Sequence, residues 1–155
     1  MLERKSGHIV FMNSLQGKVG VAFRTGYSAT KHALTGFADS LRAEVEDDGV
    51  YVTSLHPGYV NTNLSLNALS SQAGAKHGIM DANTKKGLDA RVFADKALRA
   101  IYLKDRETII ADSLANGLAV PLRSLAPNLI FWLVEKKKKK ELKQQQQLAG
   151  KQKAE

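Results

Sequence analysis

Short apolar runs alternate with stretches of helical periodicity along this chain. Three runs rich in β-branched or aromatic residues, at residues 8–12, 50–55 and 108–111, predict buried strands. Between the first two runs, apolar residues recur at helical spacing over residues 27–45, and a second helical pattern follows Asp89. The order strand, helix, strand, helix, strand predicts an α/β protein with a parallel sheet.

The segments that join these elements differ in length and polarity. Residues 13–25 are polar and contain glycines, and Pro57-Gly58 follow the second strand, so loops are predicted at both places. Residues 61–87 form a long polar connection without a clear period, which is typical of a functional lid or of disorder. Residues 114–134 are long enough to cross a bilayer, but two prolines and an arginine favour a surface-packed helical hairpin.

Most of the net charge of +8 lies in the C-terminal tail. Residues 136–155 hold eight lysines and two glutamates, so the rest of the chain carries only +2. We predict a domain over residues 1–134 and a Lys/Gln-rich basic tail over residues 135–155, either frayed helix or disordered. The tail contains no aromatic residue to stack on bases, which disfavours a nucleic-acid partner. The apolar run at residues 129–134, followed by five lysines, instead suits an anionic membrane surface.

Cysteine and histidine offer no basis for a metal site. The chain has no cysteine, which excludes disulfides and thiolate ligands. The four histidines lack the spacing of metal ligands, so no metal is predicted. His56 lies close to Pro57-Gly58 and could line a site there, but a hydrogen-bonded structural histidine is the preferred interpretation.

Polar residues that could take part in a reaction follow the first predicted strand and lie at the start of the first predicted helix. Ligands of open α/β sheets bind beyond the carboxyl ends of the strands, which is where Ser14 falls. Tyr27 and Lys31 lie four residues apart on the predicted helix and so share a face. A lysine ammonium there stabilises a phenolate, which makes Tyr27 a candidate general acid or base. A tyrosine and a lysine at this spacing are by themselves typical of a solvated helix face. The pair indicates a catalytic site only together with the surrounding sequence pattern.

That surrounding pattern resembles the second half of the short-chain dehydrogenase/reductase family. The segments that carry the resemblance are GHIVFMNS, GYSATKHA and VTSLHPGYVNT, within residues 7–64. Residues 42–44 and 63–65, with the apolar-then-lysine C-terminus, resemble the family's dehydrogenase/reductase member 7 group, and the similarity extends to about residue 134. It implies a partial Rossmann-like, doubly wound parallel sheet, of which this chain holds the last three strands with their helices.

The resemblance also implies a role for each matching residue. Tyr27 would be the catalytic acid/base, Lys31 would support it and hold the nicotinamide ribose, and Ser14 would position the substrate carbonyl. Cofactor binding would involve Tyr27 and Lys31 with the segment that supplies Pro57, Gly58, Val60 and Thr62. The implied reaction is hydride transfer between NADP or NAD and a small-molecule carbonyl or alcohol. The family further implies a homo- or hetero-oligomer, associated with the endoplasmic reticulum membrane; the cytoplasm is the alternative location.

One part of the family pattern has no counterpart in these residues. The Gly-rich pyrophosphate loop is missing, because Gly17 and Gly20 lie between the serine and the tyrosine and do not open a helix. We expect the N-terminal cofactor-binding half to be absent, the first strand to expose an apolar edge, and the truncated chain to be inactive alone. The alternative is a non-catalytic fragment or isoform that associates with a full-length relative.

Overall fold

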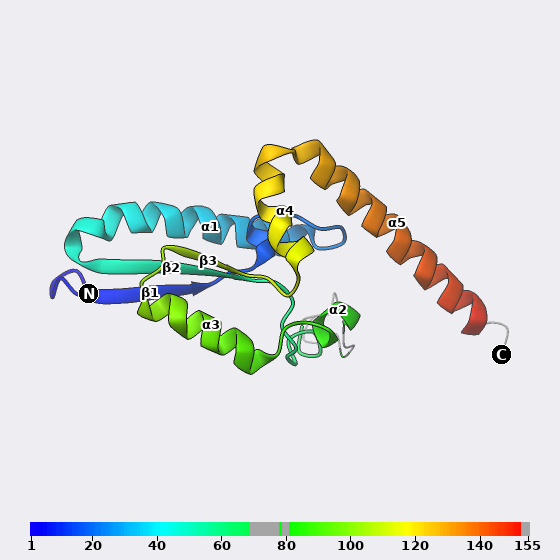
Figure 1. The fold of residues 1–155 in the computed structure, drawn as a ribbon, viewed down its shortest axis with the longest axis horizontal. Coiled ribbons are helices and arrows are strands. Elements are labelled where there is room, and N and C mark those ends of the chain that lie inside the picture. Colours follow the sequence, from blue (N-terminus) through cyan, green and yellow to red (C-terminus); the bar gives the residue numbers. More distant parts are fainter. Residues whose placement is uncertain (69–77, 79–80, 153–155) are drawn as a thin grey trace.

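Three parallel strands form the sheet of this protein. The computed structural model describes residues 1–68, 78 and 81–152 (Figure 1). The strand order is β1 (Gly7–Met12), β2 (Val50–Pro57) and β3 (Glu107–Ile110). Both neighbouring pairs are parallel. The predicted α/β class with a partial Rossmann-like sheet is confirmed.

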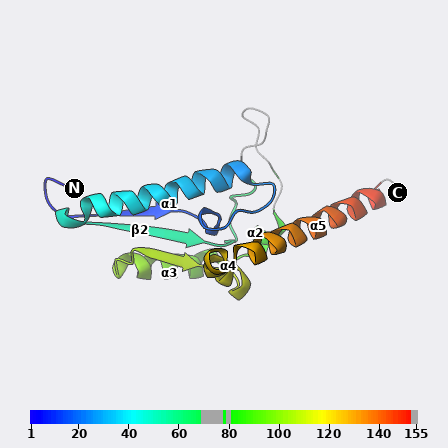
Figure 2. The same cartoon turned by 90° about the horizontal axis from the view of Figure 1, so that it is seen from above.

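A helix crosses over between each pair of strands, and the two helices cover opposite faces of the sheet (Figures 1 and 2). These are α1 (Thr25–Val45) and α3 (Ala90–Tyr102). Asp89, which the helical pattern was seen to follow, caps α3, because its carboxylate accepts from the amides of Arg91 and Val92.

The core consists of two apolar clusters, one on each face of β2. Ala38 and Val45 of α1 pack on Val50 and Val52. On the opposite face, Leu55 packs with a second group, Ala97, Ala100 and Ile110, from α3 and β3. Val52 and Leu55 face opposite ways because successive strand residues alternate between the faces. The central strand is therefore buried on both sides.

Pro57 was predicted to lie in a loop, but it is the last residue of β2. The final partners in β1 and β2 are Met12 and Leu55, so Pro57 lies beyond the end of β1. An N–H at this position would point toward β1. Because β1 has already ended, the proline costs the sheet no hydrogen bond. The ladder on the other side continues, since Gly58 N donates to Ile110 O at 2.9 Å.

β1 is an edge strand of the described sheet, since β2 is its one partner there. Val10 and Met12 are 36% and 50% exposed. The predicted apolar edge is thus present. On the helix above it, Phe37 is also exposed and meets the ring of Phe11 edge-on, with 5.8 Å between centroids.

Two helices follow β3, as the predicted hairpin requires. They are α4 (Leu114–Leu125) and α5 (Pro127–Gln152), and α5 extends away from the sheet in both views (Figures 1 and 2). The predicted boundary between residues 134 and 135 falls inside this continuous helix. No helix among the described residues is long and apolar enough to cross a membrane.

The described part of the long connection after β2 contains one short helix, α2 (Ala82–Lys85). Asp81 caps it by accepting from the amides of Asn83 and Thr84. Part of the connection that was predicted to be a lid or disordered, residues 69–77 and 79–80, lies outside the described residues.

Candidate functional site

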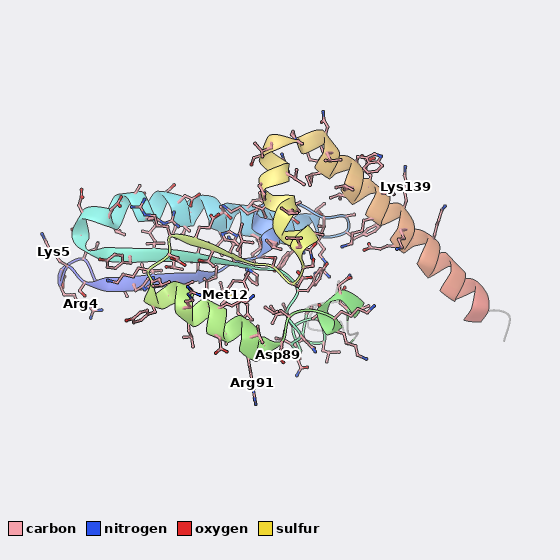
Figure 3. All side chains as sticks on the ribbon, in the orientation of Figure 1. Arg4, Lys5, Met12, Asp89, Arg91 and Lys139 are labelled. Atoms are coloured by element: carbon pink, nitrogen blue, oxygen red, sulfur yellow. The ribbon has the colours of Figure 1, made fainter. Side chains whose placement is uncertain are left out.

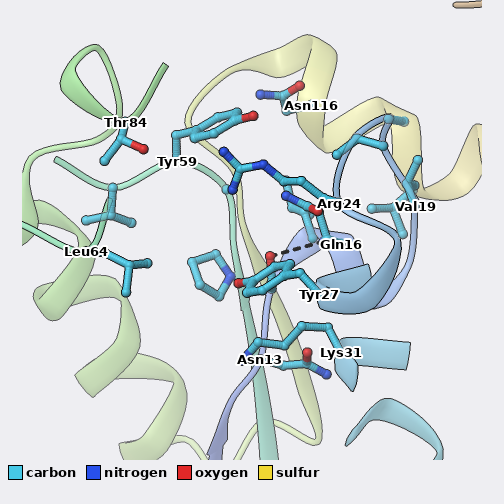
Figure 4. A pocket seen from close by; sticks show the side chains of 18 of the residues that line it. Asn13, Gln16, Val19, Arg24, Tyr27, Lys31, Tyr59, Leu64, Thr84 and Asn116 are labelled. Atoms are coloured by element: carbon cyan, nitrogen blue, oxygen red, sulfur yellow. Dashed lines mark hydrogen bonds between the residues drawn. The ribbon is translucent and has the colours of Figure 1, made fainter. Parts of the chain in front are cut away.

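A cavity of about 640 Å³ lies beyond the carboxyl ends of β1 and β2 (Figure 4). The structure brings every predicted site residue to its wall: Ser14, Tyr27, Lys31, Pro57, Gly58, Val60 and Thr62. The sequence had suggested this meeting because the two polar clusters follow neighbouring parallel strands. The roles assigned to these residues stay predictions.

Ser14 occupies the point where β1 ends and a 3-10 turn, η1 (Leu15–Gly17), begins. It is buried, and its Oγ accepts from the amide of Gln16 at 3.1 Å, which caps the turn. A hydroxyl that accepts one bond still has its own proton to donate. Ser14 therefore combines a fixed position with a donor at the cavity wall.

Tyr27 and Lys31 lie on the same side of α1, as their spacing predicted. Lys31 Nζ donates to the carbonyl oxygen of Met12 at 3.0 Å and lies 5.7 Å from the centroid of the Tyr27 ring. That separation is within reach of a cation–π interaction. The contact with Met12 ties the ammonium to the end of β1, and an ammonium carries two further protons for other acceptors.

His56 supports Ser14 from behind the cavity wall. It is fully buried, and its Nδ1 lies 3.1 Å from the Ser14 carbonyl oxygen while its Nε2 lies 3.0 Å from Ser54 Oγ. Burial is the largest influence on its pKa, which is lowered although the Ser14 carbonyl and Glu107 act in the opposite direction. The preferred interpretation of His56 as a hydrogen-bonded structural histidine is confirmed.

The tautomer of His56 follows from its partners. A carbonyl oxygen can only accept, so Nδ1 carries the proton and Nε2 accepts from the Ser54 hydroxyl. Glu107 lies 3.5 Å from Nε2 but makes its closer ion pair with Lys18, at 2.6 Å. Because the lowered pKa leaves the imidazole neutral, we treat the approach of Glu107 as a contact and not as an ion pair.

The Pro57-Gly58 segment is held by Asp112, which follows β3. Asp112 Oδ1 accepts from the amide of Tyr59 at 3.1 Å, and Asn116 Nδ2 donates to both carboxylate oxygens at 2.9 Å. A Cβ on Gly58 would overlap Asp112 Oδ1. Glycine is therefore needed for the close approach that fixes this part of the wall.

The structure adds residues to the wall that sequence reasoning missed. Arg24 extends toward Tyr59 (Figure 4), and its Nη2 pairs with Asp81 Oδ2 at 3.2 Å. Burial is the largest influence on Tyr59 and raises its pKa. Arg24 and Asp81 are 57 residues apart in the sequence, which explains why local spacing did not indicate this pair.

One face of α5 also lines the cavity, and its pattern could have been recognised. Four wall residues recur at helical spacing: Ile130, Leu133, Val134 and Lys137. The predicted domain boundary after residue 134 assigned the first three of these residues to the hairpin and Lys137 to the tail, so the shared face was not recognised.

Comparisons with known proteins agree with the fold and extend over most of the chain. The sequence profile of the family described as short chain dehydrogenase matches residues 1–73. Dehydrogenase/reductase SDR family member 7B of Bos taurus is 44% identical over 137 residues, which cover 88% of this chain and 42% of that protein. Dehydrogenase/reductase SDR family protein 7-like of Drosophila melanogaster is also 44% identical over 137 residues, covering 88% of this chain and 41% of its own length.

Solved structures show the same partial coverage. A short-chain dehydrogenase from Streptomyces avermitilis superposes with a TM-score of 0.60 at 24% identity, covering 88% of this chain and 53% of that chain. An actinorhodin polyketide ketoreductase variant with NADPH gives a TM-score of 0.52 at 25% identity, over 72% of this chain and 47% of that chain. This chain thus spans about two fifths of the curated relatives that it matches.

Proposed function

Because this chain belongs to the short-chain dehydrogenase/reductase family, we propose that its cavity is the acid–base and substrate side of an oxidoreductase that depends on NADP or NAD. The proposed reaction interconverts a carbonyl and an alcohol. One observation carries the proposal, namely that Ser14, Tyr27 and Lys31 line the same cavity as the Pro57-Gly58 segment.

Each of the three side chains has a distinct task in this reaction. In the reducing direction, Tyr27 gives its hydroxyl proton to the substrate oxygen, and in the oxidising direction it removes that proton. The Lys31 ammonium, held by the Met12 carbonyl, stabilises the negative charge that the Tyr27 oxygen then carries. Ser14 keeps its proton and orients the same substrate oxygen by donating a hydrogen bond to it. The bound cofactor would supply or accept the hydride.

The donors at the wall suit the nicotinamide end of that cofactor. Lys31 has protons left for ribose hydroxyls after its bond to Met12, and Thr62 adds a hydroxyl to the wall near Val60. In the described part of the chain, no Gly-rich turn that could hold the pyrophosphate opens a helix. We therefore expect residues 1–155 alone to show no tight binding of NADPH or NADH by isothermal titration. Micromolar binding would contradict this part of the proposal.

The test of the reaction is a chimera that joins this chain, in register with the match, to the remaining part of the Bos taurus relative. NADPH oxidation is followed with a panel of ketones and aldehydes. Tyr27→Phe should lower turnover by at least about a hundredfold, since it removes the transferable proton. Tyr102→Phe is the matched control, because Tyr102 is 85% exposed on α3 and lies outside the cavity wall. Turnover that survives Tyr27→Phe would refute the assigned role.

A second candidate function follows from the open edge of the sheet. We propose as the alternative that the chain is non-catalytic and pairs with a full-length relative through β1, where Val10 and Met12 are exposed. Co-expression of the two chains followed by size-exclusion chromatography tests this. A stable mixed complex that Val10→Lys abolishes supports the alternative, and separate elution refutes it.

A further inference from the structure

We propose that α5 docks on the surface of an anionic lipid bilayer, with its aromatic residues at headgroup depth and its lysines against the headgroups. The proposal concerns the outward side of the helix and stands independently of the reaction proposed above. It develops the apolar-then-basic pattern of the sequence into a surface with a defined orientation.

One side of α5 is anchored to the body of the protein and the other is open. Ile130 is 4% exposed and lines the cavity, whereas Phe131 and Trp132 are 48% and 54% exposed. Successive helix residues differ by 100° in direction, so these two rings turn away from the side that holds Ile130. Large exposed apolar side chains that adjoin one another indicate an interaction surface.

Each of the two exposed rings carries a cation above it. Lys136 Nζ lies 4.8 Å from the Trp132 centroid, and Arg123 Cζ lies 4.8 Å from the Phe131 centroid. Trp is enriched at membrane–water interfaces, where its ring lies at the level of the headgroups. Long basic side chains there bury their apolar stems and extend their charges to the polar region. The pairing of rings with cations therefore fits the boundary between lipid tails and headgroups.

The lysines that follow supply the charge complement. Residues 136–140 are five consecutive lysines. Lys137 lines the cavity, with its Nζ 5.9 Å from the centroid of the Tyr59 ring, so the other four supply the charge outside it. In the part of the chain that the structure describes, none of the five forms a salt bridge. α5 points away from the sheet, and the labelled Lys139 extends from it (Figure 3). Each lysine close to an anionic surface strengthens partitioning by about fivefold, so the four lysines outside the cavity are a strong determinant, although Glu135 and Glu141 flank the run.

Two other occupants fit the surface less well. A second copy of the chain that docked on the same surface would bring lysines against lysines, which is repulsive. A nucleic acid would satisfy the charge but not the exposed rings on the preceding turn, and the run of lysines has no aromatic residue to stack on bases. A bilayer satisfies both halves of the surface at once, without requiring the helix to cross it.

The 155-residue chain carries its own probe, because Trp132 is its one tryptophan. Tryptophan fluorescence and co-sedimentation are measured with phosphatidylcholine vesicles and with vesicles containing about 30% phosphatidylserine. The expected result is binding and a blue shift with the anionic vesicles alone, both weakened by salt. Quenching by brominated lipids should place Trp132 at headgroup depth. No binding, or equal binding to both vesicles, would overturn the proposal.

A matched pair of charge variants separates this surface from net charge. The triple variant Lys138→Gln, Lys139→Gln, Lys140→Gln should weaken partitioning by roughly a hundredfold, following the fivefold contribution of each lysine. The triple variant Lys85→Gln, Lys86→Gln, Lys96→Gln removes the same charge from α3, from α2 and from the residue that follows α2, and it should retain binding. Equal losses in the two variants would overturn the proposal. So would preferential binding to poly(U) RNA, or a Trp132 shift on dimerisation without vesicles.

Discussion

His56 Nδ1 lies 3.1 Å from the Ser14 carbonyl oxygen, across 42 residues of sequence. A neutral, fully buried ring near the end of β2 is thereby joined to the residue that caps the turn after β1. The position of Ser14 thus depends on a hydrogen bond from a residue that does not line the cavity.

This relationship predicts that stability falls in mild acid. Burial lowers the pKa of His56 from its ordinary value of 6.5, so below that pH the unfolded chain binds a proton that the folded chain does not. The free energy of unfolding should be highest above pH 6.5 and fall as the pH decreases from there. The slope is at most about 1.4 kcal/mol per pH unit for one histidine. Urea denaturation between pH 5 and pH 8 measures it.

His8 must be controlled in that experiment. Its pKa is also lowered, by burial and then by Lys104, so it contributes a slope of the same sign. His8→Gln and His56→Asn, each of which retains an amide donor, are compared singly and together. A pH dependence that His56→Asn leaves unchanged would show that this ring is not its source.

Ser14→Ala should affect stability and turnover to different extents. The loss of the cap on the Gln16 amide is expected to cost about 1 kcal/mol of unfolding free energy. Turnover of the chimera should fall further, by about a hundredfold, because the substrate oxygen loses a donor. Ser14→Thr keeps a hydroxyl and should recover part of both. Equal activity of Ser14→Ala and the unaltered chimera would remove Ser14 from the mechanism.

Gly58→Ala should destabilise the protein by about 1–3 kcal/mol, since its Cβ would overlap Asp112 Oδ1. Gly36→Ala is the control of opposite sign, because a Cβ there has no neighbour within 4 Å, and alanine favours the helix by about 1 kcal/mol. Thermal denaturation measures both. In the double variant Gly58→Ala, Asp112→Ala the two effects should not add, because the overlap disappears.

Ile130→Ala should loosen α5 from the body. The side chain is buried, and its truncation is expected to cost about 2 kcal/mol or more. Leu129→Ala changes a neighbour that is 44% exposed and should cost much less. Trypsin cleavage at the lysines of residues 136–140 should accelerate in the first variant. Equal cleavage rates would show that Ile130 does not anchor the helix.

The elements with a strong apolar period were predictable, and the reasons for the exceptions are physical. The strands and α1 follow from β-rich runs and from helical spacing, and Asp89 marks the start of α3. The tail offered no such period. Lysine, glutamine and leucine nevertheless have high helix propensity, and α5 continues through Gln152.

The candidate site divides in the same way. Ser14, Tyr27 and Lys31 were found from local order because they follow one strand and open one helix. The support given by Asp112 to Gly58 and Tyr59, and the pair of Arg24 with Asp81, join residues more than 50 positions apart. Such contacts arise when crossover connections bring strand ends together, and no spacing rule within one element reveals them.

The buried side of Ile130 fixes the rotational phase of α5. One residue inserted between Pro127 and Ile130 would rotate everything after it by 100° about the helix axis. The apolar wall of the cavity and the direction of the lysines would then shift together. In this protein, the shape of the cavity and the direction in which the lysines point therefore both depend on the rotation of α5 about its own axis.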